Sequence, residues 1–181
     1  MILTREFYMD DTTDMARAML GKILCRRMPD GTIRRAKVAE VELYHESEHG
    51  CHAYGGRKTP RNGAMFLPGG HAYVYFTYGM HNMFNIVVGP VGCGVGVLIR
   101  AVEIDGGNGP ARLTKTLQIT RELNGVDMCA PDAPLWLEDA PAVSRRKIKS
   151  GPRIGIESAG EDAKLPWRFA ICDSKYLSRP I

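Results

Sequence analysis

Side chains able to activate a water molecule occur in residues 38–44, where two glutamates and a tyrosine alternate with apolar residues. Glu40, Glu42 and Tyr44 are spaced two apart, so on a β-strand they project from the same face. A carboxylate beside an aromatic ring at a strand end is suited to act as a general base next to a flat platform. The alternative is a pair of solvated glutamates on an edge strand, which the spacing alone leaves open.

Arg100 is the second chemical candidate, because it lies within the apolar residues 95–102. A guanidinium inside so apolar a strand needs a carboxylate or another anion to offset its lost hydration. We therefore expect Arg100 to have an anionic partner. The alternative is an arginine near the strand end whose head group reaches solvent.

The densest aromatic stretch of the chain is residues 72–80. Tyr73 and Tyr75 share one face of the expected strand, whereas Tyr78 lies on the other face, next to the turn at Gly79. An exposed tyrosine at the tip of a hairpin is suited to insertion between base pairs. The alternative is that all three tyrosines pack against their neighbours.

Basic residues form two groups that could contact phosphates. The formal net charge of +4 permits a polyanionic partner without requiring one. The alternative is a solvated basic surface with no such partner. The first group is Arg57, Lys58 and Arg61, and the second is Arg145, Arg146, Lys147, Lys149 and Arg153.

A pattern typical of zinc hydrolases, H-E-x-x-H, occurs just after the first candidate strand. It requires a helix, which places both histidines on one face, but the preceding residues have strand chemistry and Gly50 would limit a helix to about one turn. We expect a polar loop and no metal; a zinc hydrolase or incidental metal binding is the alternative. The residues concerned are His45, Glu46, Ser47, Glu48 and His49, with Cys51 and His52 close by.

The elements that position these residues are mostly strands. Short strands with few long crossover helices predict an α+β domain with a largely antiparallel sheet. Residues 45–70, rich in Gly, Pro and Asn, predict a long loop, and such loops inside compact domains are usually functional. We expect strands at 23–28, 32–44, 72–78, 83–88, 95–104, 135–137, 153–156 and 168–171, and helices from Thr12 or Thr13 to about residue 20 and over 111–123.

Composition limits the possible classes of protein. A chain of 181 residues with 44% apolar residues is sufficient for one domain, residues 1–181, with a real core. Five cysteines without a CxxC pair favour reduced thiols over a disulfide framework or a zinc ribbon. No apolar run approaches the roughly 20 residues that span a bilayer. We expect a cytoplasmic protein that does not associate with membranes.

Taken together and in this order, these segments resemble the alkyladenine (3-methylpurine) DNA glycosylase family. The resemblance extends over nearly the whole chain, from residue 16 to residue 169. It implies a single mixed domain with a curved sheet, flanking helices and a protruding β-hairpin. The most specific segments are residues 40–44, 52–66, 73–80, 85–86, 97–101 and 153–156.

The resemblance implies a hydrolytic centre of three residues. Glu42 is similar to the general base that activates water in this family. Arg100 and the backbone carbonyl of Ile154 are similar to the groups that hold that water. No lysine occurs among the matched pocket positions. The resemblance therefore implies a monofunctional enzyme without a Schiff base, and no cofactor.

The resemblance also implies a pocket for one flipped base. Tyr44 and His52 would stack on one side of the base and Tyr75 on the other. Asn85 would crowd the exocyclic amino group of guanine and so exclude normal purines. Tyr78 would fill the gap left in the duplex.

The implied function is base excision repair of duplex DNA by a monomer. The expected substrates are 3-methyladenine, 7-methylguanine, hypoxanthine and ethenoadenine, whose glycosidic bond a Glu-activated water would hydrolyse. Alkylated purines carry positive charge, and aromatic rings attract cations. A non-catalytic nucleic-acid-binding module is the first alternative, and the zinc hydrolase is the second.

Overall fold

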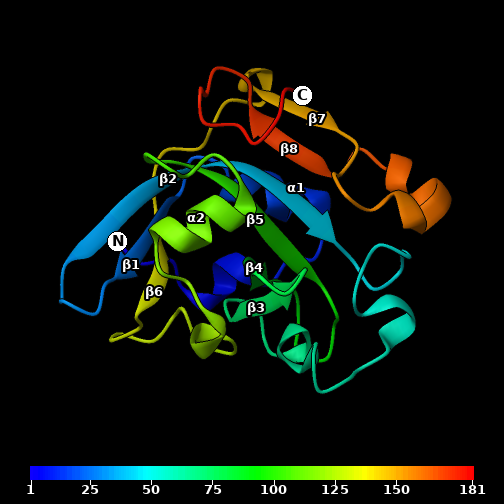
Figure 1. Cartoon of the computed structure of the whole chain (residues 1–181), viewed down its shortest axis with the longest axis horizontal. Coiled ribbons are helices and arrows are strands. Elements are labelled where there is room, and N and C mark those ends of the chain that lie inside the picture. Colours follow the sequence, from blue (N-terminus) through cyan, green and yellow to red (C-terminus); the bar gives the residue numbers. More distant parts are fainter.

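The computed structural model describes all residues, 1–181, and is built on one curved sheet of eight strands (Figure 1). Every strand pair is antiparallel. The central order is β3-β4-β5-β2-β1-β6, while β8 also pairs with β2, and β7 with β8. The predicted α+β class with an antiparallel sheet is confirmed. The strands are β1 (Ile23–Arg27), β2 (Ile33–Tyr44), β3 (Ala72–Thr77), β4 (His81–Val87), β5 (Gly96–Glu103), β6 (Leu135–Glu138), β7 (Ile148–Gly151) and β8 (Arg168–Ile171).

The long strand β2 has paired neighbours on both of its edges around the two glutamates. Its first residues pair with β1, and from Glu40 to Glu42 it pairs with β8 instead. On its other edge it pairs with β5, with an irregularity in the register around Glu40. Both glutamates are fully buried. The alternative of solvated glutamates on an edge strand is therefore wrong.

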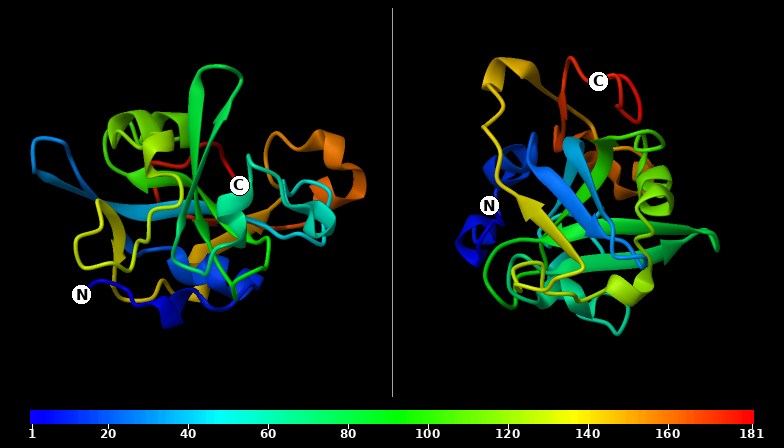
Figure 2. Two further views of the ribbon diagram at one scale, coloured as in Figure 1. Left: turned by 90° about the horizontal axis from the view of Figure 1, so that it is seen from below. Right: turned by 90° about the vertical axis from the view of Figure 1, so that its left-hand side faces the viewer.

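Two α-helices pack on opposite faces of the sheet: α1 (Thr13–Met19) against β2, and α2 (Pro110–Thr116) against β4 and β5 (Figures 1 and 2). The predicted start of α1 is confirmed, because the Thr12 hydroxyl accepts a hydrogen bond of 3.2 Å from the Asp14 amide. Its end is confirmed by Gly21, which has φ +84° and lies too close to Val143 for a side chain.

The helix predicted over residues 111–123 is shorter than expected, since α2 ends at Thr116. Gln118 takes a left-handed conformation with φ +48°, which interrupts the helix. The buried Arg26 side chain donates to the carbonyls of Leu117 and Gln118 at 3.2 and 3.3 Å. Arg26 thus satisfies carbonyl groups that a continuing helix would have used.

The strand predicted over residues 153–156 is also wrong, because the strand in this region is β7, Ile148–Gly151. The backbone after β7 leaves the sheet. Its Ile154 amide donates to Glu42 rather than to a neighbouring strand, and Gly155 has φ +78°. This segment is irregular because its backbone bonds to a side chain of β2 and not to a neighbouring strand.

The predicted loop of residues 45–70 is confirmed, and the β3–β4 hairpin protrudes from the sheet as expected (Figure 2). No helix has the length and apolar character needed to cross a membrane. The remaining regular segments are 3-10 turns at Arg5–Tyr8, Tyr54–Gly56, Gly63–Phe66, Arg121–Leu123, Arg145–Lys147 and Glu157–Lys164.

Candidate active site

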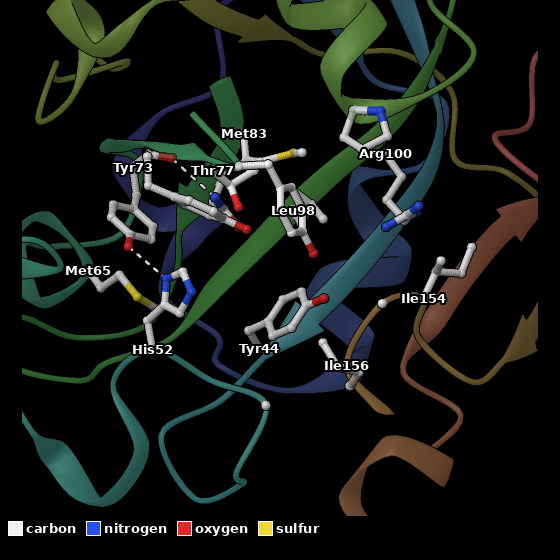
Figure 3. A pocket seen from close by; sticks show the side chains of 16 residues that line it. Tyr44, His52, Met65, Tyr73, Thr77, Met83, Leu98, Arg100, Ile154 and Ile156 are labelled. Carbon is white, nitrogen blue, oxygen red and sulfur yellow. Dashed lines mark hydrogen bonds between the residues drawn. The ribbon is translucent and has the colours of Figure 1, made fainter. Parts of the chain in front are cut away.

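A cavity of about 290 Å³ opens between the base of the protruding hairpin, β5 and residues 154–156 (Figure 3). Its volume is near the lower end of the usual range for small-molecule pockets, about 300 to 1,000 Å³. Glu42 has no exposed surface and lies behind the wall, in contact with three of the lining residues. The structure brings together all the other predicted catalytic, base-pocket and intercalating residues in the wall: Tyr44, His52, Tyr75, Tyr78, Asn85, Arg100 and Ile154.

Glu42 accepts hydrogen bonds from three groups. Oε2 accepts from the Tyr44 hydroxyl at 2.8 Å and from Nη1 of Arg100 at 3.2 Å, and Oε1 accepts from the Ile154 amide at 2.9 Å. The expected anionic partner of Arg100 is thus Glu42, with Glu40 beside it. A carboxylate offers about four acceptor sites, and Oε1 accepts from only one protein group.

The pKa of Glu42 is raised above the ordinary value of a glutamate. Burial is the largest cause, and the nearby charge of Glu40 adds to it. Arg100, the Ile154 amide and the Tyr44 hydroxyl act in the opposite direction, because each stabilises the ionised form. A buried carboxylate with a raised pKa takes a proton more readily than an exposed one. This is the property that a general base requires.

Ile154 contacts Glu42 through a group that was not predicted. The family resemblance implies that its backbone carbonyl holds the water, whereas the structure shows its amide donating to Oε1 of Glu42. The role of the carbonyl stays a prediction. The amide contact places residues 154–156 along the wall of the cavity.

Three aromatic side chains line one end of the cavity (Figure 3). Figure 3 labels two of them, His52 and Tyr73. The ring centroids of His52 and Tyr75 are 4.6 Å apart at 73°, and those of Tyr73 and Tyr75 are 5.4 Å apart. Nδ1 of His52 is 2.9 Å from the Tyr73 hydroxyl. His52 and Tyr75 touch, so a base stacked between them would require the two rings to separate. The predicted arrangement of His52 and Tyr75 around a base stays a prediction.

His52 and Tyr75 are uncharged at this end of the cavity, and the Arg61 guanidinium lies beside them. Burial is the main cause that lowers the pKa of His52, and Arg61 contributes. His52 is therefore neutral at physiological pH and does not repel a cationic ligand. Burial also raises the pKa of Tyr75 to about 12, so its hydroxyl stays protonated. Neutral aromatic faces attract cations.

The tip of the β3–β4 hairpin is apolar and exposed. Tyr78 is 81% exposed and has φ +52°, and Phe76 and Met80 beside it are also exposed. An 81% exposed tyrosine is not a packing residue, so the packing alternative is wrong for Tyr78. Tyr73, in contrast, is buried, as expected for a packing residue. The exposed position of Tyr78 at the rim of the cavity is compatible with insertion into a duplex.

The two basic groups lie in different places. In the first group, the guanidinium of Arg61 is 5.7 Å from the ring centroid of Tyr75, beside the cavity. In the second, Arg145 pairs at 3.5 Å with Asp14 of α1, on the face of the sheet opposite α2. The structure therefore places Arg145 away from the cavity, and phosphate contacts by either group stay a prediction.

The zinc-hydrolase interpretation of residues 45–49 is wrong. The segment is a series of turns and not a helix. His45 bonds to Ser47 and His49 bonds to Asp162, so the two histidines do not share a site. Nowhere in the chain do three potential metal ligands cluster.

Sequence reasoning missed a buried ion pair that fixes this loop. The Arg153 guanidinium makes two bonds of 2.6 and 2.8 Å to the Glu48 carboxylate, and it lies 4.8 Å from the ring centroid of Tyr44. Arg153 was placed among the basic surface residues, but its side chain is fully buried. No spacing rule could have joined residues that are so far apart in the chain.

Arg168 was also missed, although the sequence offered a signal for it. Like Arg100, it is an arginine among apolar residues, and it likewise has a buried acidic partner, Glu40, at 2.7 Å. The contact of Ser178 with the same glutamate had no sequence signal.

Comparison with known proteins identifies relatives over almost the full length. The family described as Methylpurine-DNA glycosylase (MPG) matches residues 6–108 and 105–175. A protein of Streptomyces avermitilis is 44% identical, over 97% of this chain and 90% of its own length. A protein of Methanocella arvoryzae is 42% identical over 98% and 96%, and one of Carboxydothermus hydrogenoformans is 41% identical over 99% and 100%. All three have the name "Putative 3-methyladenine DNA glycosylase".

Proposed function

Because the chain belongs to the methylpurine-DNA glycosylase family and is therefore a DNA glycosylase, a hydrolase of N-glycosyl bonds, we propose that Glu42 is its general base and that its substrates are purines flipped out of duplex DNA. The substrates are alkylated or deaminated purines: 3-methyladenine, 7-methylguanine, hypoxanthine and ethenoadenine. The observation that supports this most directly is the buried Glu42 carboxylate, which three donors orient behind an aromatic cavity. The protein acts as a monomer on double-stranded DNA.

The reaction begins with rotation of the damaged nucleotide out of the base stack, since the bond cannot be attacked inside the duplex. Unstacking costs a few kcal/mol, least for a damaged or mispaired base. Tyr78 enters the vacated space and offsets part of that cost. The base then enters the aromatic cavity, and a cationic 3-methyladenine or 7-methylguanine gains from the ring faces there.

Hydrolysis then proceeds through a sugar with oxocarbenium character. The glycosidic bond breaks and its electron pair stays on the base nitrogen, so a cationic purine leaves as a neutral one. A neutral purine such as hypoxanthine leaves as an anion and takes up a proton from water. The oxygen of a water molecule bonds to C1′ while the Glu42 carboxylate takes one of its protons. The negative charge of Glu42 also stabilises the positive charge that develops on the sugar. Arg100 and Ile154 keep the carboxylate in place.

The direct test is single-turnover release of base from duplexes that each contain one 7-methylguanine or one hypoxanthine, with a chelator present. We expect free base and an abasic strand, and no strand cleavage. An undamaged duplex of the same sequence is the control. Binding without an abasic product on every damaged duplex would contradict the proposal and would favour the non-catalytic nucleic-acid-binding module.

The first variant to test in this framework is Tyr78→Ala. Stacking of an aromatic side chain on a base is worth about 1 to 3 kcal/mol, so we expect roughly a tenfold or greater loss in the equilibrium for flipping. A fluorescent purine at the damaged position reports flipping directly. Tyr78→Phe keeps the ring and should flip like the parent. Equal flipping by Tyr78→Ala and the parent would exclude this role.

The second variant concerns selectivity. Asn85 is 4% exposed and its Nδ2 donates to the Tyr73 carbonyl at 3.2 Å, so its position in the cavity wall is fixed. Asn85→Ala and Asn85→Ser make room for the exocyclic amino group of guanine. We expect release of guanine from undamaged DNA to rise by about tenfold, with little change for hypoxanthine, which lacks that group. Guanine release that stays at background would show that Asn85 does not exclude guanine sterically.

A further inference from the structure

A second buried carboxylate, Glu40, lies beside the one assigned as the base. It has no exposed surface, and Oε1 accepts from Nε of Arg168 at 2.7 Å. The same oxygen lies 3.5 Å from Nε of Arg100. Glu40 and Glu42 thus share Arg100 between them. The proposed chemistry uses Glu42 and leaves Glu40 without a role.

The residue that completes this arrangement is Ser178. Its amide donates to Oε2 of Glu40 at 2.6 Å, and its hydroxyl donates to Oε1 at 2.8 Å. The same hydroxyl oxygen accepts from Nε of Arg100 at 3.4 Å. Residues 179 and 180 are held in turn, because their carbonyls accept from Nη2 of Arg168 at 2.6 and 3.3 Å. The segment from Ser178 onward is therefore tied to two arginines and one glutamate of the sheet.

We propose that Glu40 and Ser178 are positioning residues, which hold the Arg100 guanidinium in the orientation in which Nη1 meets Glu42. The inference rests on the proposed function, because it assigns the two residues to the same reaction. It makes residues 178–180 part of the active site, although none of them lines the main cavity.

The geometry of the guanidinium explains how this works. The group is planar and rigid, so fixing its Nε side fixes the direction of Nη1. The Nε–H of Arg100 lies between two oxygens, Oγ of Ser178 and Oε1 of Glu40, at 3.4 and 3.5 Å. Neither contact alone is short, and together they limit rotation on that side.

The charges of the site are also balanced by Glu40. Arg100, the Tyr44 hydroxyl, the Ile154 amide and Glu40 face Glu42, and Tyr75 and Arg153 also interact with its charge. Arg168 has Glu40 as its short-range partner at 2.7 Å. Two carboxylates and two guanidiniums thus form a neutral buried network in which every member is paired, and such networks rigidify the side chains they contain.

The closing experiment measures single-turnover base release as a function of pH for Ser178→Ala, with Ser178→Thr and Ser174→Ala as matched variants. Ser178→Ala removes the hydroxyl and leaves every charge in place. We expect about a tenfold lower plateau rate, DNA affinity within about twofold of the parent, and an acid limb displaced to higher pH. The limb moves because a mobile Arg100 guanidinium stabilises the ionised form of Glu42 less, so the pKa of Glu42 rises. Ser178→Thr keeps the hydroxyl and should restore both the rate and the limb.

The controls separate positioning from a loss of folded protein. Ser174 lies four residues before the segment from Ser178 onward and its Oγ accepts only a contact of 3.4 Å from the Tyr176 amide, so Ser174→Ala should behave like the parent. A purely structural effect lowers the rate without moving the acid limb. If Ser178→Ala releases base at the rate of the parent and with the same acid limb, the positioning role alone is overturned. A parent that releases no base from any damaged duplex would overturn the proposed function, and this inference with it.

Discussion

Replacement of Glu42 by glutamine is expected to lower the single-turnover rate of base release by about 10²- to 10⁴-fold, the usual contribution of a general base. The amide cannot take a proton from water, and it lacks the negative charge that stabilises the oxocarbenium-like sugar. Its size is nearly unchanged, so the cavity keeps its shape. The measurement is the rate of abasic product formation from a 7-methylguanine duplex with enzyme in excess.

Affinity for DNA provides the internal control for Glu42→Gln. A duplex with a non-hydrolysable analogue at the damaged position should bind the variant and the parent about equally, because Glu42 lies behind the cavity wall. Glu122→Gln is the matched surface variant, since Glu122 is exposed and contacts only Thr120 among side chains. Its rate should equal that of the parent. Base release by Glu42→Gln within a few-fold of the parent would show that another group activates the water.

The pH profile of the parent is expected to show the protonation of the same carboxylate. The ionised form is the active one, so the rate falls as the pH decreases through the pKa of Glu42. Burial raises that pKa, which places the acid limb above the range of an exposed glutamate. The rate of base release by Glu42→Gln should be low and should not decrease further as the pH falls through this range.

The sequence predicted most of the strands, the common face of Glu40 and Glu42 and an anionic partner for Arg100, for physical reasons that are local. Alternation fixed the common face of Glu40 and Glu42, and burial of Arg100 in an apolar strand predicted an anionic partner. The hairpin turn at Gly79 placed Tyr78 at an exposed tip. Each of these inferences depends on residues within one element, where spacing determines direction.

What the sequence could not predict depends on contacts between distant segments. The end of α2 is set by the Arg26 side chain of β1, and the irregular backbone at Ile154 is set by its bond to Glu42. The H-E-x-x-H pattern around Glu48 predicted a polar loop and left a metal site as the alternative. The actual partner of Glu48 is Arg153, more than a hundred positions later. Such pairings follow from the fold and have no signature in spacing.

The Arg153–Glu48 pair carries the largest expected effect on stability. Both side chains are almost completely buried, at 0% and 3% exposure, and the carboxylate and guanidinium are joined by two bonds. Glu48→Ala leaves the arginine charge buried without its partner, which costs about 3 to 5 kcal/mol of unfolding free energy. For a chain of this length we expect Tm to fall by roughly 10 °C. Thermal unfolding followed by circular dichroism measures this shift.

An exposed ion pair of the same kind provides the control for Glu48→Ala. Glu161 pairs with Lys164 at 2.7 Å, but the two side chains are 88% and 73% exposed, so Glu161→Ala should change the unfolding free energy by less than about 1 kcal/mol. The double variant Glu48→Ala with Arg153→Met removes the unpaired charge and should recover part of the loss. A Tm for Glu48→Ala equal to that of Glu161→Ala would show that the pair does not stabilise the loop. Because Arg153 also packs against Tyr44 and immediately precedes Ile154, we expect Glu48→Ala to slow base release even at temperatures where the variant is fully folded.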